Sequence, residues 1–117
     1  MRHLTHKIKL SSNKGHQTLL IRNLAMSLII YDKIKTTESR ARVIKPFVEH
    51  LVNIVKTKEK REAIRLVEKL LQHDNASRKL FEVIAPKYKD VTGGYLRTTR
   101  LGYRNGDNAS VVQIEFV

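Results

Sequence analysis

Apolar residues recur at helical spacing in the first part of this chain, between residues 16 and 31. One face of the predicted helix carries Leu20, Leu24, Leu28 and Tyr31. Other apolar residues cover most of its remaining surface, and such a helix is typical of the middle of a domain, with other elements packed around it. Its amino end is expected to be capped by Ser11, Ser12 or Asn13.

The next apolar repeat predicts a second, amphipathic helix. Its members stand at i, i+3, i+7, i+10 and i+14: Ala41, Ile44, Val48, Leu51 and Val55. Pro46 lies inside this pattern, so we expect the helix to be kinked there or divided into two consecutive pieces. Residues 56–61 have little apolar content and are expected to form a charged connector.

Two shorter helices are predicted after this connector. The third helix is expected to turn inward Ala63, Val67, Leu70 and Leu71. The fourth is expected to be capped by Asp74 or Asn75 and to end before Pro86. Its inward side is formed by Ser77, Leu80, Phe81 and Ile84.

The remaining patterns predict strands. Residues 34–37 form a short β-branched segment that ends in a helix cap, and residues 95–101 and 110–117 read as a hairpin around a glycine-containing loop. In the last strand Val112, Ile114 and Phe116 share one face. The expected fold class is therefore α+β: about four helices packed with a small three-stranded sheet, plus a basic N-terminal arm. The arm is residues 1–14, and residues 15–117 form one domain.

The charge of the chain indicates the kind of partner that it binds. The chain has 23 Lys and Arg against 11 Asp and Glu, a formal net charge of +12, and a sequence pI near 10.2. Its first acidic residue is Asp32, after five Lys and Arg. Solubility alone needs a net charge of only about 2 to 8 in a small domain, so a merely solvated basic face explains less than a polyanionic partner does. The excess of Lys and Arg over Asp and Glu therefore favours a nucleic acid as the binding partner.

Other features narrow the class of protein. The chain has no Cys, which excludes disulfides, thiolate nucleophiles and cysteine-ligated zinc fingers. Its start lacks the long apolar core of a signal peptide, so we expect a cytoplasmic, unexported protein. Carboxylates are scattered without pairing, and no nucleophile motif is present. We therefore expect a binding protein rather than an enzyme, with no cofactor, metal site, membrane or small-molecule substrate.

The N-terminal arm is the first candidate binding segment. Phosphates are expected to be contacted by Arg2, Lys7, Lys9 and Lys14, and bases or sugars by His3, His6 and His16. The alternative is a tail that only aids solubility, but such tails normally lack residues like Leu4, Ile8 and Leu10. A zinc site built from the three histidines would have no supporting Cys or carboxylate.

The C-terminal hairpin is the second candidate. Arg97 and Arg100 are three residues apart, so on a regular strand they point to opposite faces. Arg104 lies in the loop beside glycines that allow a phosphate to approach the backbone. Tyr95 and Tyr103 offer rings for stacking. An ordinary hairpin with solvated arginines explains this pattern equally well.

The third candidate is the start of the second helix. Thr36 or Thr37, together with the amides of the first turn, forms a helix start suited to an anion, and Lys35 and Arg40 stand beside it. Glu38 is explained as a partner of the helix dipole. Arg22, on the apolar first helix, must either point outward or meet a partner, and we count it among the RNA-binding residues.

Blocks of residues along almost the whole chain resemble one family. They include Met1-Arg2-His3, Arg22-Asn23-Leu24-Ala25, Thr36-Thr37-Glu38, Lys79-Leu80-Phe81-Glu82, Gly93-Gly94-Tyr95 and Gly106-Asp107. In order and spacing these resemble the bacterial large-subunit ribosomal protein seventeen family. The resemblance implies an α+β fold around a three-stranded sheet and binding to 23S ribosomal RNA near the exit of the nascent-peptide tunnel. It also implies neighbours among the ribosomal proteins numbered three, twenty-two and thirty-two, and a role in subunit assembly and translation.

Two alternative functions fit the sequence less well. A basic DNA-binding helical module would need a helix with one basic, base-reading side, whereas the first predicted helix carries a single interior cation, Arg22. A membrane-bound scaffold would need a helix with Lys and Arg on one face and bulky apolar residues on the other, and no predicted helix has both.

Overall fold

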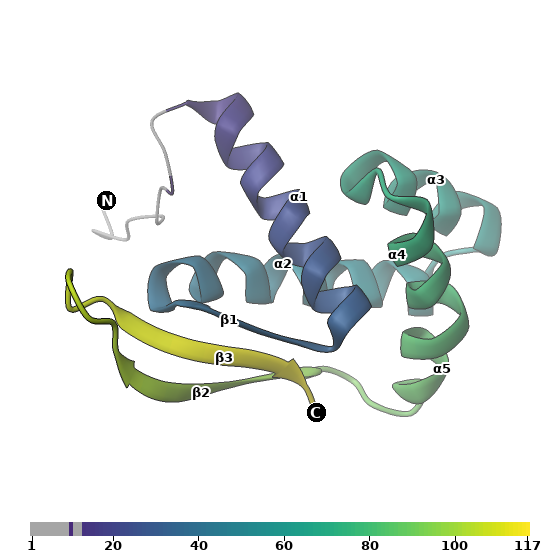
Figure 1. The fold of residues 1–117 in the computed structure, drawn as a ribbon. Helices are drawn as coiled ribbons and strands as arrows, with labels where there is room; N and C mark the ends of the chain where they lie inside the picture. Colours follow the sequence, from purple (N-terminus) through teal and green to yellow (C-terminus); the bar gives the residue numbers. More distant parts are fainter. Residues whose placement is uncertain (1–9, 11–12) are drawn as a thin grey trace, which may run out of the picture.

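The computed structural model describes residue 10 and residues 13–117, and within them it has the predicted α+β architecture (Figure 1). The first half contains α1 (Lys14–Tyr31), β1 (Lys33–Thr37), α2 (Glu38–Thr57) and α3 (Lys60–Leu71). A continuous helical segment follows, made of α4 (Asp74–Lys79), the π-helical η1 (Leu80–Ile84) and α5 (Ala85–Lys87). The chain ends with β2 (Leu96–Tyr103) and β3 (Ser110–Phe116). No described helix is long and apolar enough to cross a membrane.

The three strands form one antiparallel sheet in the order β1-β3-β2. Ile114 of β3 pairs with Ile34 of β1, and the neighbouring Val112 is also buried, which confirms the predicted inward face of the last strand. Figure 1 shows α2 lying along this face, while none of the described helices covers the opposite face of the sheet. The register of β2 shifts between Arg100 and Gly102, where Gly102 has a φ of 129° that suits a glycine in a bulge.

Helix α2 is the centre of the core. Its predicted apolar face is buried except at Val55, which is half-buried, and Ile44, Val48 and Leu51 are fully inaccessible to solvent. The helix continues through Pro46 as one element, so the division into two pieces is wrong, while the other expected outcome, a kink at Pro46, stays a prediction. Proline removes only the bond to the carbonyl of residue 42, and the buried side chains on either side of Pro46 pack into one continuous core.

Helix α1 is less enclosed than its apolar sequence indicated. It buries Ala25, Leu28 and Ile29, all in its second half, whereas the side chains of Leu19 and Tyr31 are 56% and 70% exposed. Figure 1 shows why: the carboxyl half crosses α2, and the amino half extends away from the rest of the molecule. The expectation that other elements surround this helix is therefore wrong for its first half. Its cap is Asn13, whose side chain accepts a hydrogen bond from His16 N at 3.2 Å.

Three predicted boundaries in the helical region also change. The connector between α2 and α3 is only residues 58–59. The cap of α4 is His73, whose Nδ1 accepts from Ala76 N at 3.1 Å, rather than Asp74 or Asn75. Pro86 does not stop the helical segment, which continues to Lys87, one residue beyond it; the amide hydrogen that proline lacks is lost only in the last turn of the segment.

Candidate nucleic-acid interface

Two segments that are far apart in the sequence meet in a hollow at the amino end of α2. It has a volume of about 250 Å³ and is lined by Lys35, Thr36, Thr37, Arg40, Arg104 and Val111. None of these lining residues is acidic. The first four come from β1 and the start of α2, and the last two from the loop after β2 and from β3. The structure therefore brings the second and third candidate segments together around one basic hollow.

The helix start at this hollow has backbone donors to offer. Thr37 is the cap residue of α2, with extended backbone (φ −73°, ψ 155°), and its side chain makes no capping hydrogen bond within the described residues. The first amides of a helix have no partner within the helix and carry the positive end of its dipole. An anion in the hollow would therefore meet these amides as well as the side chains of Lys35 and Arg40.

Arg104 is held in the hairpin loop by Asp107. Arg104 Nε donates to Asp107 Oδ1 at 3.1 Å, Arg104 Nη2 donates to Asp107 Oδ2, and Ala109 N also donates to Asp107 Oδ1, at 3.2 Å. These bonds lower the pKa of Asp107 to about 2, the hydrogen bond from Arg104 being the largest cause, and they raise the pKa of Arg104. The loop arginine is thus oriented before any ligand binds.

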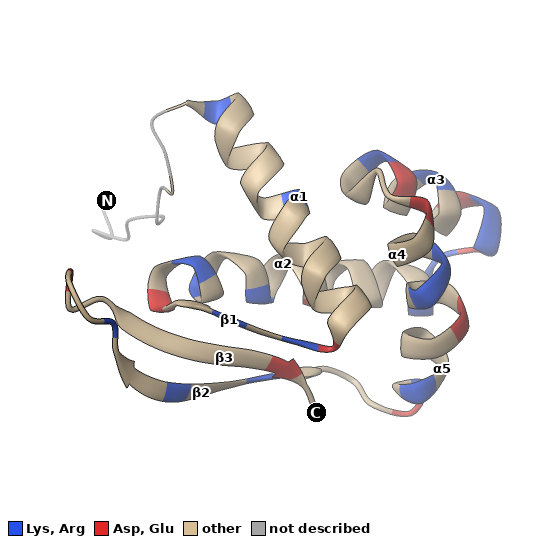
Figure 2. Ribbon diagram, in the orientation of Figure 1, with Lys and Arg blue, Asp and Glu red and all other residues tan. Residues whose placement is uncertain are grey.

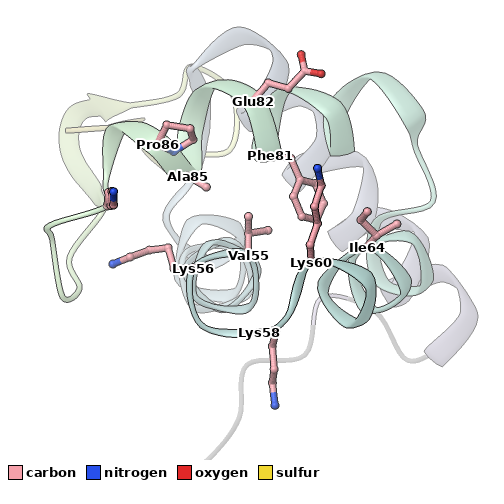
Figure 3. Close-up of a pocket in the computed structure, with 10 residues that line it drawn as sticks. Val55, Lys56, Lys58, Lys60, Ile64, Phe81, Glu82, Ala85 and Pro86 are labelled. Carbon is pink, nitrogen blue, oxygen red and sulfur yellow. The ribbon is translucent and has the colours of Figure 1, made fainter.

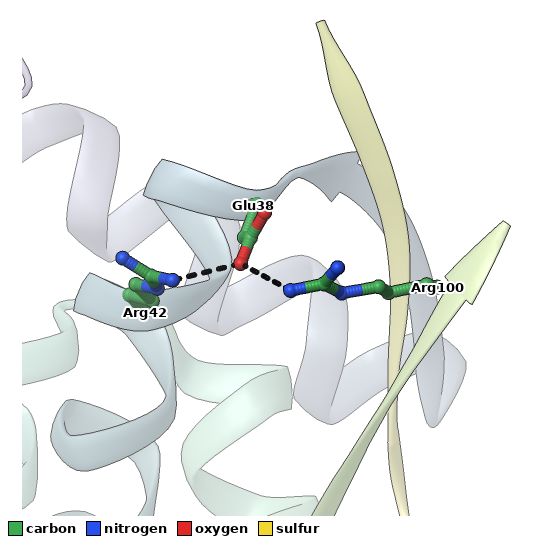
Figure 4. A network of polar contacts seen from close by, with 3 residues as sticks. All are labelled: Glu38, Arg42 and Arg100. Carbon is green, nitrogen blue, oxygen red and sulfur yellow. Dashed lines mark hydrogen bonds and ion pairs between the residues drawn. The ribbon is translucent and has the colours of Figure 1, made fainter. Parts of the chain in front are cut away.

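Arg97 and Arg100 point to opposite faces of the sheet, as predicted. Arg97 pairs with Glu115 (Nη2 to Oε1, 3.2 Å), its cross-strand neighbour. Arg100 lies opposite the buried Val112, and on that side it reaches Glu38 at the start of α2, at 3.3 Å. Figure 4 shows Glu38 between Arg100 and Arg42, and Glu38 Oε1 also accepts from Arg42 Nη2 at 2.8 Å.

Figure 2 shows Lys and Arg along β1, the first turns of α2 and the hairpin, and also on α3 and the segment from α4 to α5. One cation of α2 was not predicted as a site residue from the sequence. It is Lys45, which lines a second hollow together with Glu38, Arg42 and Arg100. Its spacing from Glu38 and Arg42, at i+7 and i+3, would have placed it on the same helical face.

Comparison with known proteins decides the family. The model of the family described as Ribosomal protein L17 matches residues 20–117 of this chain. This chain belongs to the ribosomal protein L17 family. Proteins named large ribosomal subunit protein bL17 are similar to it over its full length. The one from Neorickettsia sennetsu is 37% identical over 117 residues, which cover 100% of both chains. One from Thermus thermophilus is 41% identical over 118 residues, which cover 100% of this chain and 99% of the relative.

In this L17-family chain, Tyr95 is a core residue, so its prediction as a stacking surface is wrong. Its side chain is 0% exposed and its ring packs edge-on against Tyr88, with the ring centroids 5.2 Å apart. Its hydroxyl donates to Asn53 Oδ1 at 2.6 Å and accepts from Lys56 Nζ at 2.8 Å. A ring enclosed in this way has no face for a base. Tyr103, by contrast, is 71% exposed.

Arg22 forms hydrogen bonds to residues at the carboxyl end of α3. Its Nε donates to the carbonyl of Leu70 at 3.1 Å, and its Nη1 donates to Gln72 Oε1 at 3.0 Å. Its Nη2 lies 3.4 Å from the carbonyl of Lys69. The guanidinium thus satisfies carbonyls at the carboxyl end of α3, where a cation also complements the helix dipole. These contacts favour a structural role for Arg22, and its assignment to RNA stays a prediction.

The arm lies mostly outside the described residues of this L17-family protein. Arg2, His3, His6, Lys7 and Lys9 are not described, so their assignment to RNA stays a prediction. Lys14 and His16 are described, and both lie exposed in the first turn of α1. Among the described residues, no three His, Asp or Glu side chains gather as metal ligands.

Proposed function

We propose that this chain is a structural component of the large ribosomal subunit and binds 23S ribosomal RNA near the exit of the nascent-peptide tunnel. Membership of the L17 family and the name of its relatives, large ribosomal subunit protein bL17, support the ribosomal role. The position near the tunnel exit rests on the family resemblance, as do neighbours among the ribosomal proteins numbered three, twenty-two and thirty-two. In this role the protein acts by binding in the cytoplasmic ribosome, and supports assembly and translation without catalysing a reaction.

The observation that carries RNA binding is the hollow at the amino end of α2. It joins Lys35, Arg40 and Arg104 to a helix start with uncapped amides, and none of its described lining residues is acidic. Its volume of about 250 Å³ exceeds the roughly 30 Å³ that one water molecule occupies several-fold, so it has room for a phosphate group. Phosphate contacts fix the register and orientation of a protein on a nucleic acid, and a hollow formed by helix amides and fixed cations suits that role.

The remaining cations extend this contact. We propose that Thr36, Thr37 and Arg100 contribute to the RNA-binding surface at the hollow, that Arg97 contacts RNA from the opposite face of the sheet, and that Lys14, His16 and the undescribed arm residues add a further contact. Exposed arginines on a sheet and in its loop can follow the phosphates on either side of the hollow. Tyr103 replaces Tyr95 as the ring available for stacking on an unpaired base.

A DNA-binding helical module is less favoured. It needs a helix with a basic, base-reading side. In α1 the Lys and Arg side chains are Lys14 and Arg22, and Arg22 is bonded to α3. Competition of 23S RNA binding by duplex DNA of equal length, at equal salt, would distinguish the two functions.

The experiment measures binding of the full chain to a 23S RNA transcript over a series of KCl concentrations. The variant Lys35→Gln/Arg40→Gln should reduce the log–log salt slope by about 0.7 to 0.9 for each phosphate that the protein no longer binds. The matched control, Arg61→Gln/Lys69→Gln, removes two exposed cations of α3 and should leave the slope unchanged. Equal slopes for the two variants would contradict the proposed site. Absence of the chain from salt-washed large subunits would contradict the ribosomal role.

A further inference from the structure

A groove with an apolar floor lies at the opposite end of α2 from the basic hollow. Its volume is about 560 Å³, and it is formed by the carboxyl end of α2, the start of α3 and the segment from η1 to the turn after α5. Helix α2 has 20 residues, which corresponds to roughly 30 Å at 1.5 Å per residue. A ligand in the groove therefore leaves the basic hollow free.

The floor of the groove is hydrophobic and incompletely covered. Val55, Ile64 and Phe81 are each partly buried, and Ala85 and Pro86 continue the apolar surface. Figure 3 shows Val55 and Phe81 on facing elements, with Ile64 beside them. When a partner removes apolar surface of this kind from water, the free energy of the complex is lowered. Exposed apolar patches framed by charged residues are therefore typical of interaction sites.

The rim of the groove is basic. Among the described residues it is lined by four lysines, Lys56, Lys58, Lys60 and Lys89, against one carboxylate, Glu82. Two of the lysines are already engaged. Lys56 Nζ donates to Tyr95 Oη and lies 4.9 Å from the ring centroid, and Lys58 Nζ is 3.9 Å from Glu62 Oε1.

Lys60 and Lys89 are the other two lysines of the rim. Neither forms an ion pair within the part of the chain that the structure describes. Both side chains belong to exposed residues at the edge of the apolar floor. The groove thus offers two ammonium groups, available for an acidic ligand, beside a hydrophobic surface.

We propose that this groove binds an acidic, amphipathic segment of a partner protein. The apolar side chains of the segment lie on Val55, Ile64 and Phe81, and its carboxylates meet Lys60 and Lys89. This is the recognition mode in which an amphipathic segment lays its apolar side in a hydrophobic groove while charges set orientation and partner choice. RNA matches the rim but not the floor, because a sugar–phosphate backbone has little apolar surface to bury against aliphatic side chains.

The proposal does not depend on RNA binding, and the test is arranged accordingly. The photo-crosslinking residue p-benzoylphenylalanine replaces Pro86 in the full chain expressed in cells, and crosslinked species are identified by mass spectrometry. A second version carries it at Glu82, an exposed position on the same groove, in case the first variant folds poorly. Thermal unfolding checks the fold of both. We expect crosslinks to a protein segment that contains both Asp or Glu and bulky apolar residues.

Charge reversal then tests the rim. In the crosslinking chain, Lys60→Glu/Lys89→Glu should lower the yield about tenfold or more, because attraction at two positions becomes repulsion. The matched control Arg61→Glu/Lys69→Glu makes the same change in net charge on exposed positions that do not line the groove, and should leave the yield within about twofold. Crosslinks to RNA, to a second copy of this chain or to a segment without acidic residues would overturn the proposal. Equal loss in both charge-reversal variants, or no crosslink from either groove position in folded protein, would also overturn it.

Discussion

Glu38 and Arg100 are 62 residues apart in the chain, yet Arg100 Nη2 lies 3.3 Å from Glu38 Oε1. The same oxygen accepts from Arg42, one helical turn along α2, so a single carboxylate links the start of α2 to the edge strand β2 (Figure 4). The sequence explained Glu38 as a partner of the helix dipole. Its position in the fold gives it a second effect, which is to neutralise part of the positive charge next to the proposed RNA-binding hollow.

Replacing Glu38 should therefore strengthen RNA binding. Glu38→Gln removes one negative charge and frees Arg42 and Arg100, whose side chains are 64% and 75% exposed. We expect tighter binding to 23S RNA, a steeper salt slope, and a loss of about 1 to 2 kcal/mol in the free energy of unfolding, because two ion pairs and the interaction with the helix dipole are lost together. The control is Glu62→Gln, whose carboxylate lies near Lys58 at the other end of α2. Weaker RNA binding by Glu38→Gln would contradict this role.

Arg22→Gln should affect stability and not RNA binding. The change leaves carbonyls at the carboxyl end of α3 without their charged donor, and such a loss costs about 1 to 3 kcal/mol. Urea unfolding monitored by circular dichroism measures the cost. Arg61→Gln, which removes an exposed cation of α3, should leave the unfolding midpoint nearly unchanged. A reduced salt slope of RNA binding in Arg22→Gln would return this residue to the interface.

Tyr95→Phe should destabilise the fold although it keeps the buried ring. The substitution removes the hydroxyl that donates to Asn53 and accepts from Lys56. We therefore expect a loss of about 1 to 2 kcal/mol in the free energy of unfolding. Tyr103→Phe removes a hydroxyl from an exposed ring and should change stability by less than about 0.5 kcal/mol. Chemical denaturation of both variants makes the comparison. Equal stability of the two variants would show that the buried hydroxyl contributes nothing.

Arg104 and Asp107 give a prediction about pH. The folded-state pKa of Asp107, about 2, lies below its ordinary value of 3.8, so the folded state favours the ionised carboxylate. Its contribution to stability is therefore complete above pH 3.8 and is lost as the pH falls through about 2. In Arg104→Ala we expect an NMR titration of the Asp107 carboxyl carbon to move its midpoint back toward 3.8, since the main cause of the low pKa is gone. Arg97→Ala should leave that midpoint unchanged.

The same Arg104→Ala variant separates binding from folding. Arg104 is exposed and its ion pair is confined to the loop, so its loss should lower the melting temperature little. It lines the basic hollow, so RNA binding should weaken. A large fall in melting temperature with unchanged RNA affinity would make Arg104 a structural residue instead.

The arm gives a prediction that rests on the sequence alone. Lys7, Lys9 and Lys14 carry fixed charge in a stretch without acidic residues. Replacing all three with Gln should reduce the log–log salt slope of 23S RNA binding by about 0.7 to 0.9 for every phosphate that these lysines bind. An unchanged slope would show that the three lysines bind no phosphate. Because the three positions precede the domain core, thermal unfolding of the triple variant should match that of the parent chain.

The sequence by itself determined the elements and the charge of this protein. Helical spacing identified the buried face of α2, and strict alternation identified the inward face of β3, because both periodicities are local properties of the backbone. Surplus cations indicated a polyanionic partner in the same way. Exposure of individual side chains was harder to infer: nothing local to Tyr95 or Arg22 indicates that one is enclosed by Tyr88 and Asn53 and the other bonded to α3.

Only the tertiary structure decided which distant residues act together. The basic hollow needs β1, the start of α2 and the hairpin loop to converge, and the groove needs both ends of the α2–α3 turn to face η1. Such arrangements depend on how the helices cross and how the sheet packs on α2, which are long-range contacts that no short sequence window contains. Glu38 is the clearest case, since the strand that supplies its second arginine is positioned by the core and not by the neighbours of Glu38 in the chain.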